Sequence, residues 1–342
     1  MLSSLESSRT PMAPVSLIQA KQDRTRDVLA VAAIAAAGTA AWVAGRAQRA
    51  EQRHPPLGRF VHVDGVALHY IERGQGTPVV LLHGNVVMLQ DFIAGGLFDT
   101  LAERYRVIAF DRPGFGYSAR PRDRLWTPDA QADLLLHAFT RLGIERPIVV
   151  GHSWATLVAI ALGMRAAARR LVLISGYYFP TLRADAALVA PVALPIIGDV
   201  LRYTVSAVIA RLSLRRTVAT MFAPEPVPTD YLSLLHRELL LRPSQMRADA
   251  EEGALLVPAA ARFRDRYSDL DVPVAIIAGE ADRIVDPQTH SARLHRALPG
   301  STSRVVPGAG HMLHHTHAAE VVAAIGETRE AASVSAVAVA PS

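Results

Sequence analysis

The chain has 342 residues, half of them hydrophobic, which is enough for one large domain with a sizeable buried core. It contains no cysteine, so disulfides and thiolate metal sites are excluded. The net charge of +5 comes almost wholly from arginine, because Lys21 is the only lysine. The basic residues are scattered and form no stripe interleaved with aromatic side chains, so no nucleic-acid partner is predicted.

An uncharged apolar segment lies near the N-terminus. Residues 1–27 before it are polar and have no period, and we expect them to be disordered. As a helix, residues 28–45 would span roughly 27 Å at about 1.5 Å per residue, close to the hydrocarbon thickness of a bilayer. Trp42 lies where an interfacial anchor is expected. The long polar start favours a single membrane anchor over a cleaved signal peptide or a soluble alanine-rich helix, and basic residues on both sides leave its orientation open.

The globular part begins after a proline-containing linker at residues 46–58. Residues 59–64 and 67–72 alternate at period two around Gly65, which predicts a β-hairpin. Continuous apolar runs typical of doubly buried strands follow at residues 78–83, 105–110, 147–150, 171–175 and 272–278. Helical patterns lie between some of them, at residues 131–142 and 157–168. The alternation predicts an α/β fold with a doubly wound, mostly parallel sheet and functional groups at the carboxyl ends of its strands.

A helical insertion interrupts this alternation at about residues 177–266, where several prolines divide the pattern. The α/β alternation then resumes, so that the main domain is expected over residues 59–330. Residues 331–342 have small side chains, and we expect them to form a disordered tail.

Ser153 stands between an apolar run and an alanine-rich helical pattern, in the sequence IVVGHSWAT at residues 148–156. This is typical of a strand, a tight turn and a helix with the serine at the apex. Such a turn projects the hydroxyl and leaves helix N-terminal amides free to stabilise an oxyanion. Close approach of strand and helix requires small residues two before and two after the serine, and Gly151 and Ala155 satisfy this.

The Gly-x-Ser-x-Ala string resembles the nucleophile elbow of the α/β-hydrolase superfamily, Gly-x-Ser-x-Gly, with Ala155 as a mild departure. The resemblance is to the branch of serine esterases and haloperoxidases. It implies an eight-stranded sheet, with the insertion after strand six acting as a cap over the active site. In the sequence this domain is preceded by the N-terminal hydrophobic helix.

The same resemblance assigns the acid and the base of a catalytic triad. The acid of the family follows the seventh strand, where Asp282 stands in a Gly-x-x-Asp pattern; Glu280 and Asp286 are nearby competitors, and Asp286 before Pro287 is typical of a helix N-cap. The family histidine lies in a loop after the eighth strand, and His311 follows Gly308-Ala309-Gly310.

Three more histidines, His314, His315 and His317, follow His311. A metal site is the alternative interpretation, but without a partnering carboxylate or cysteine motif we expect them on the surface of a helix start, and no metal is predicted.

Two backbone amides are expected to form an oxyanion hole. Trp154 follows the nucleophile, and Asn85 follows His83-Gly84, which resembles the His-Gly-x motif of the family. His83 itself is expected to hold its loop by hydrogen bonds. Residues 111–118 resemble another family block that shapes the loop beside the site.

The nucleophile separates this chain from two similar groups. Haloalkane dehalogenases share His-Gly-Asn and the tryptophan, whose side chains bind halide, but their nucleophile is aspartate, as in epoxide hydrolases; a serine alkoxide suits acyl carbon. Proline iminopeptidases also carry a tryptophan after the serine, but they have His-Gly-Gly-Pro-Gly where this chain has HGNVV. The sequence therefore favours an esterase over a peptidase.

The sequence therefore predicts a membrane-tethered serine hydrolase that cleaves a small to medium apolar ester or thioester through an acyl-enzyme, without cofactor. Apolar stretches of the insertion suggest a lipophilic pocket, or simple packing of helices on the core. The alternatives are other chemistry of the same triad, namely C–C hydrolysis, perhydrolysis or acyl transfer, and a non-catalytic ligand-binding protein.

Overall fold

The structure is a computed structural model that describes residues 15–181 and 190–326. Its centre is an eight-stranded sheet with the strand order β1-β2-β4-β3-β5-β6-β7-β8. The strands are β1 Arg59–Val63, β2 Val66–Arg73, β3 Pro78–Leu82, β4 Arg106–Phe110, β5 Ile148–His152, β6 Arg170–Ile174, β7 Val274–Gly279 and β8 Thr302–Val306. The pairs β1/β2 and β2/β4 are antiparallel and the others are parallel. The predicted doubly wound, mostly parallel sheet and its hairpin are confirmed.

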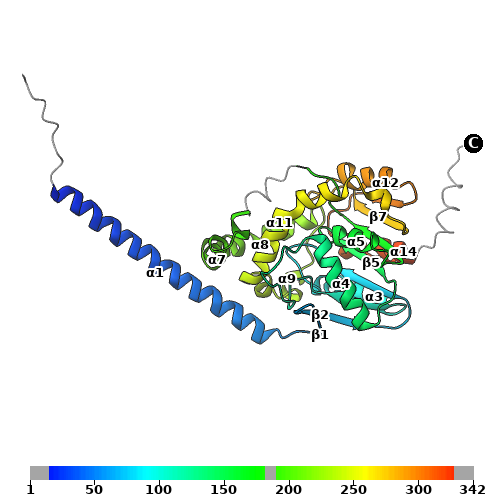
Figure 1. The fold of residues 1–342 in the computed structure, drawn as a ribbon, viewed down its shortest axis with the longest axis horizontal. Coiled ribbons are helices and arrows are strands. Elements are labelled where there is room, and N and C mark those ends of the chain that lie inside the picture. The colour runs from blue at the N-terminus through cyan, green and yellow to red at the C-terminus, as the bar shows by residue number, and fades with distance from the viewer. Residues whose placement is uncertain (1–14, 182–189, 327–342) are drawn as a thin grey trace, which may run out of the picture.

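Helices cover both faces of the sheet (Figure 1). They are α2 Gln90–Ala94, α3 Leu97–Ala102, α4 Pro128–Leu142, α5 Ala155–Gly163, α12 Arg293–Ala297, α13 Leu313–Thr316 and α14 Ala318–Gly326, with a π-helical turn at Gln288–Ala292. The central strands are apolar except at their ends, because each face packs on helices. In β5, for example, Val149 belongs to the core on the α4 and α5 side and Val150 to the core on the α14 side.

The helix predicted at residues 157–168 is α5, which ends earlier, at Gly163. Ala166 has a left-handed backbone with φ of 52°. The amide of Ala167 donates to the carbonyl of Leu162, and that of Ala166 to Gly163, as in a Schellman turn. The alanine-rich composition concealed this stop, because alanine favours helix at every position.

Between β6 and β7 the chain forms a helical insertion, as predicted. It contains α7 Ile197–Tyr203, α8 Val205–Phe222, α9 Tyr231–Leu234, α10 Arg237–Leu240 and α11 Pro243–Phe263, followed by a 3₁₀ turn at Tyr267–Asp269. We call residues 190–263 the helical insertion.

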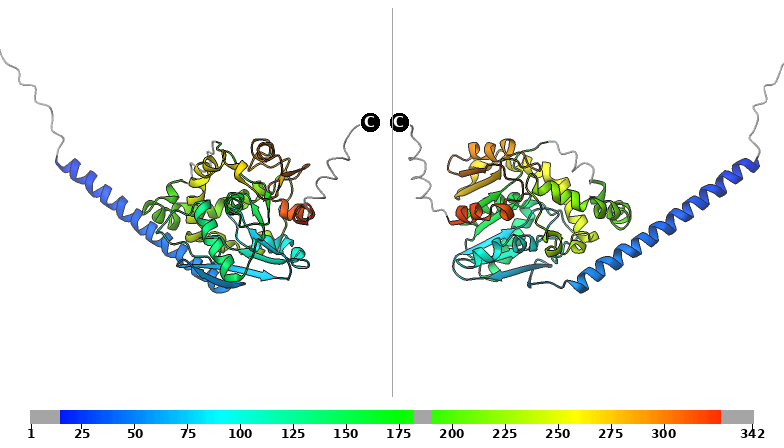
Figure 2. Two further views of the ribbon diagram at one scale, coloured as in Figure 1. Left: turned by 45° about the vertical axis from the view of Figure 1, so that its right-hand side comes forward. Right: turned by 180° about the vertical axis from the view of Figure 1, so that it is seen from behind.

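The N-terminal region differs from the prediction. One helix, α1, runs over Val15–Arg53, so residues 15–27 and 46–53, expected to be disordered and a linker, are helical. Its segment Gln22–Arg53 is long and apolar enough to cross a membrane. Only 6% of the most apolar stretch of this segment is buried against the rest of the protein. Figure 2 shows that most of α1 stands clear of the domain. The predicted tail at residues 331–342 lies outside the described residues.

Candidate active site

Ser153 lies at a sharp turn between β5 and α5. Its backbone is left-handed, with φ of 53°. This conformation is uncommon for residues other than glycine, and residues that adopt it are enriched at functional sites. Its amide donates to the carbonyl of Ile174 at 2.8 Å, which fixes the turn against the end of β6. These are the features of a nucleophile elbow.

Gly151 allows the close approach that this turn needs. A Cβ atom at Gly151 would lie 2.8 Å from the carbonyl oxygen of Ala155, which is closer than real Cβ contacts. We expect Gly151→Ala to lower the free energy of unfolding by roughly 1–3 kcal/mol through this overpacking. Thermal unfolding measures it, with Gly300→Ala as control, because a Cβ at Gly300 meets no atom within 4 Å. Equal melting temperatures for the two variants would contradict the close contact.

His311 and Asp282 meet at the carboxyl ends of β8 and β7. The imidazole Nδ1 of His311 lies 2.7 Å from Oδ2 of Asp282, and both side chains are almost completely buried. The other carboxylate oxygen accepts the amides of Ile284 at 2.8 Å and Val285 at 3.0 Å. Asp282 is thereby held in one orientation, as a group that orients a general base must be.

The two competing acids make other contacts. Oδ1 of Asp286 accepts the amide of Thr289 at 2.7 Å, which is the hydrogen bond of the expected helix N-cap. Oε2 of Glu280 accepts the amide of Gly308 at 3.1 Å.

His152 connects the serine turn to the histidine loop. Its Nε2 lies 3.1 Å from the carbonyl oxygen of His311 and therefore donates to it, since a carbonyl only accepts. The ring is buried beside Gly84, where an added Cβ would lie 3.0 Å from Nδ1 of His152 and 3.1 Å from Cβ of Ser153. The loops carrying Ser153, His311 and Gly84 thus converge at one point. The contact of His152 with the His311 loop could not be predicted from local sequence, because the two residues are 159 positions apart and only the fold brings them together.

The two expected oxyanion donors lie at this point of convergence. In the described part of the chain, the backbone amides of Asn85 and Trp154 donate no hydrogen bond to another protein group. Nδ1 of His83 donates to the carbonyl of Gly84 at 2.7 Å, and Nε2 accepts the amide of Arg112 at 3.0 Å. Burial lowers the pKa of His83 to about 3, so the ring is neutral and holds the loop, as expected for it.

Arg112 is the main support of the Asn85 loop. Its guanidinium donates to the carbonyls of His83 at 2.7 Å and Gly84 at 3.1 Å, and to Oδ1 of Asn85 at 2.9 Å. It also forms a fully buried ion pair with Glu252 of α11, at 2.6 Å. The sequence placed Arg112 in a loop-shaping block but did not identify Glu252, which lies 140 residues away.

The helical insertion also holds Trp154. The indole Nε1 donates to the backbone carbonyl of Glu252 at 3.0 Å, and the Arg112 guanidinium lies 4.9 Å from the ring centroid. The indole N–H is therefore already used within the protein. This differs from the halide-binding role that tryptophan has in the dehalogenases.

Asp249 of α11 ties the insertion to the same loop, because its Oδ1 accepts the amide of Val86 at 2.7 Å. Burial raises the pKa of Asp249 to about 7, and the nearby Glu252 carboxylate acts in the same direction. A raised carboxyl pKa means that the folded state binds more protons than the unfolded state between about pH 4 and pH 7, so stability falls as pH rises through that window.

Asp249→Asn is therefore expected to remove this loss while keeping an oxygen acceptor for Val86. Urea unfolding from acidic to alkaline pH measures the effect. The free energy of unfolding of the variant should rise relative to that of the wild type between about pH 4 and pH 7, and the difference between the two should be constant above about pH 8. Parallel profiles for the two proteins would contradict the shifted pKa.

The histidines behind His311 correct one prediction. His314 and His315 are not on the surface: their Nε2 atoms lie 2.6 Å and 2.8 Å from the two oxygens of buried Asp91. Tyr231 also donates to Asp91 at 2.8 Å. Among the described residues, ligand atoms of Asp91, His152 and His314 lie within 4.8 Å of one another. Because three donors already occupy the Asp91 oxygens, we interpret the cluster as a hydrogen-bond network.

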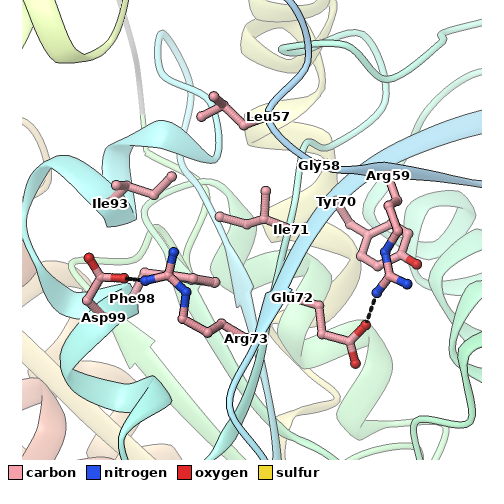
Figure 3. Close-up of a pocket in the computed structure, with 10 residues that line it drawn as sticks. All are labelled: Leu57, Gly58, Arg59, Tyr70, Ile71, Glu72, Arg73, Ile93, Phe98 and Asp99. Atoms are coloured by element: carbon pink, nitrogen blue, oxygen red, sulfur yellow. Dashed lines mark hydrogen bonds and ion pairs between the residues drawn. The ribbon is translucent and has the colours of Figure 1, made fainter.

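A separate hollow of about 480 Å³ lies at the start of the sheet (Figure 3). Its lining includes the ion pairs Arg59–Glu72 and Arg73–Asp99. Ser153 and His311 do not line it, so it is not the site described above.

Comparison with known proteins agrees with this fold. A family model described as the alpha/beta hydrolase fold matches residues 77–318. The chain belongs to this family and is a hydrolase of that fold.

Two relatives are 2-hydroxymuconate semialdehyde hydrolases. The one from Pseudomonas sp. strain CF600 is 35% identical over 38% of this chain and 48% of its own, so the match spans about half of that relative. The one from Pseudomonas putida is 26% identical over 79% of this chain and 92% of its own. Among solved structures, a bacterial membrane phospholipase A superposes with a TM-score of 0.60 and 19% identity, covering 90% of this chain and all of its own.

Proposed function

We propose that the protein hydrolyses an apolar carboxylic ester or thioester through an acyl-enzyme. The observation that carries the proposal is the buried His311–Asp282 pair, at 2.7 Å, in a loop that contacts the serine turn. A base oriented by a carboxylate beside a serine in a strained turn is the arrangement that activates a hydroxyl nucleophile.

In the proposed reaction the Ser153 hydroxyl attacks the acyl carbon and His311 accepts its proton. Asp282 keeps the imidazole in the required tautomer and stabilises the imidazolium. The amides of Asn85 and Trp154 bind the oxyanion of the tetrahedral intermediate. His311 then gives the proton to the leaving alcohol or thiol. Water, deprotonated by His311, attacks the acyl-enzyme and releases the acid and the free serine.

The surroundings of the site favour an apolar acyl group. One core cluster joins the Asn85 loop, the insertion and the histidine loop, and includes Val87, Met88, Phe222 and Met312. Met312 directly follows His311, and Val87 lies two residues after Asn85. These four apolar side chains are fully buried and make the surroundings of the site apolar, and we infer that the insertion acts as its cap.

We also propose that α1 anchors the enzyme in a membrane. Its segment Gln22–Arg53 is long and apolar enough to cross a bilayer and is hardly buried by the domain. Carbonate extraction of membranes containing the full chain tests the anchor. The protein should stay in the membrane fraction, and release into the supernatant would exclude a span.

C–C bond hydrolysis is the second candidate, because two relatives carry the name of such an enzyme. A panel of esters, thioesters and vinylogous diketones separates the two functions. We expect turnover of esters, with an acyl adduct on Ser153 visible by mass spectrometry after rapid acid quenching. Preference for the diketones would favour the second candidate. Turnover that persists in Ser153→Ala would exclude both triad mechanisms.

A further inference from the structure

The helical insertion presents an apolar face to solvent. On α8, four large apolar residues at helical spacing i, i+3, i+4 and i+7 are exposed: Val205 58%, Val208 40%, Ile209 58% and Leu212 80%. The opposite side of α8, including Leu214, Val218 and Met221, is buried in the domain. α8 therefore has a core face and a second apolar face without a partner in the described structure.

The neighbouring turn and α7, which contacts α8, also expose large apolar residues. Leu194, Ile196, Ile197 and Val200 are 50%, 78%, 54% and 58% exposed. Together with the four residues of α8 they form what we call the insertion patch. Single exposed apolar residues are ordinary, but so many on adjacent helices mark an interaction surface.

The insertion patch adjoins the candidate membrane span. α1 contacts α7 and α10, and Figure 1 shows α7 on the side of the domain that faces α1. The guanidinium of Arg211 lies 5.0 Å from the Trp42 ring centroid, and Arg46 and Arg211 both pair with Glu238. Val208, a member of the patch, lies one turn before Arg211 on the same face of α8. The patch therefore adjoins the contact with Trp42, the residue expected at the membrane interface.

Charges border the apolar surface on the side expected for lipid headgroups. Arg215 and Arg216 are exposed on α8 within one turn after Leu212. On α1, Arg49 and Arg53 are exposed after the apolar run. An apolar helix face bordered by arginines is typical of a helix that lies in the interface of an anionic bilayer.

We propose that the insertion patch docks into the bilayer leaflet that α1 enters, so that the insertion takes its ester substrate from the lipid phase. This inference rests on the proposed function, because it requires α1 to be an anchor. α1 fixes the height of the domain through Trp42, and the patch brings α7 and α8 into the headgroup and acyl boundary.

The absence of cysteine makes a direct test possible in the full chain. Single variants Ile209→Cys and Leu212→Cys are labelled with an environment-sensitive nitrobenzoxadiazole dye. They are reconstituted in vesicles of phosphatidylcholine and phosphatidylglycerol with or without nitroxide-labelled lipid. Ile34→Cys, exposed on α1, reports the anchor, and Val305→Cys, exposed on the edge strand β8, is the control outside the patch.

We expect a blue shift and nitroxide quenching at positions 34, 209 and 212, but not at 305. Quenching at 34 without quenching at 209 and 212 would overturn the docking and leave the anchor intact, including the case in which a second copy covers the patch. No quenching at 34 would overturn the anchor, and the docking with it.

Activity gives an independent readout. The variant Ile209→Asn/Leu212→Gln is expected to hydrolyse a vesicle-borne ester at least about tenfold more slowly than the wild type, because less apolar area enters the bilayer. Its turnover of a soluble short-chain ester should be unchanged. Equal rates on vesicles would overturn the inference, whereas a wild type inactive on the soluble ester would overturn the proposed function instead.

Discussion

Replacing His311 with alanine is expected to lower ester turnover about 10⁴- to 10⁶-fold, because triad members act as a unit and a serine without its base is a poor nucleophile. His311 is buried, but Asp282 keeps the hydrogen bonds from the amides of Ile284 and Val285 in the variant, so we expect it to remain folded. Steady-state hydrolysis of a p-nitrophenyl ester and thermal unfolding measure the two properties.

His317→Ala is the matched control, because His317 lies in the same segment, partly exposed and 3.5 Å from Glu225. It should keep turnover within about twofold of the wild type, as surface substitutions do. A His311→Ala enzyme that turns over as fast as His317→Ala would contradict the assigned base.

Replacing Arg112 with methionine is expected to lower the free energy of unfolding by up to about 3–5 kcal/mol, since it removes the nearest cation from the buried Glu252 carboxylate. Among the described residues, Arg120 at 3.4 Å then remains as the ion-pair partner of Glu252. Both side chains of the Arg112–Glu252 pair have no exposed surface. Urea unfolding with matched wild type measures the loss. The double variant Arg112→Met/Glu252→Leu should regain most of it, because an apolar pair of similar volume is often as stable as a buried ion pair.

Turnover should not recover in the double variant, because Asn85 and the carbonyls of His83 and Gly84 all lose the hydrogen bonds that Arg112 donates. Within the described residues, the Gly84 carbonyl then keeps only the bond from His83. A stable double variant with wild-type turnover would show that Arg112 serves the core and not the oxyanion loop. A double variant as unstable as Arg112→Met would contradict the buried-charge explanation.

Local sequence predicted β5 and β7, which carry Ser153 and Asp282, but not β8 before His311, whose residues are mostly exposed. Apolar runs predicted β5, β6 and β7, and strand ends in a parallel sheet share one edge, which places Ser153 and Asp282 at the same edge. The choice of Asp282 over the neighbouring acids came from the resemblance to the family. The Asp282–His311 contact follows from the adjacency of β7 and β8. The oxyanion residues were assigned by resemblance to a family motif.

Contacts between distant segments could not be predicted. Asp91 and His314 are 223 residues apart, and no pattern near His314 shows that a buried carboxylate meets it. For the same reason the sequence suggested a surface position for His314. Burial of both groups depends on how α2 and α13 pack at the sheet edge, which is a property of the whole fold.

The N-terminal helix shows a different limit. Charges near Lys21 led to the prediction of a disordered start, but lysine, arginine and glutamine are good helix formers, and the helix begins at Val15. Its end at Arg53 agrees with the prolines at 55 and 56, since the residue before a proline is disfavoured in a helix. Hydrophobicity was enough to locate the apolar segment, whereas the ends of the helix depend on the helix propensity of the polar residues around it and on the prolines.

The most direct test of the central claim is labelling of the full chain by a fluorophosphonate probe, with the modified peptide identified by mass spectrometry. The proposed mechanism predicts a single adduct on Ser153 in the wild type and none in folded Ser153→Ala or His311→Ala. Labelling at another residue, or a folded wild type that stays unlabelled, would contradict Ser153 as an activated nucleophile.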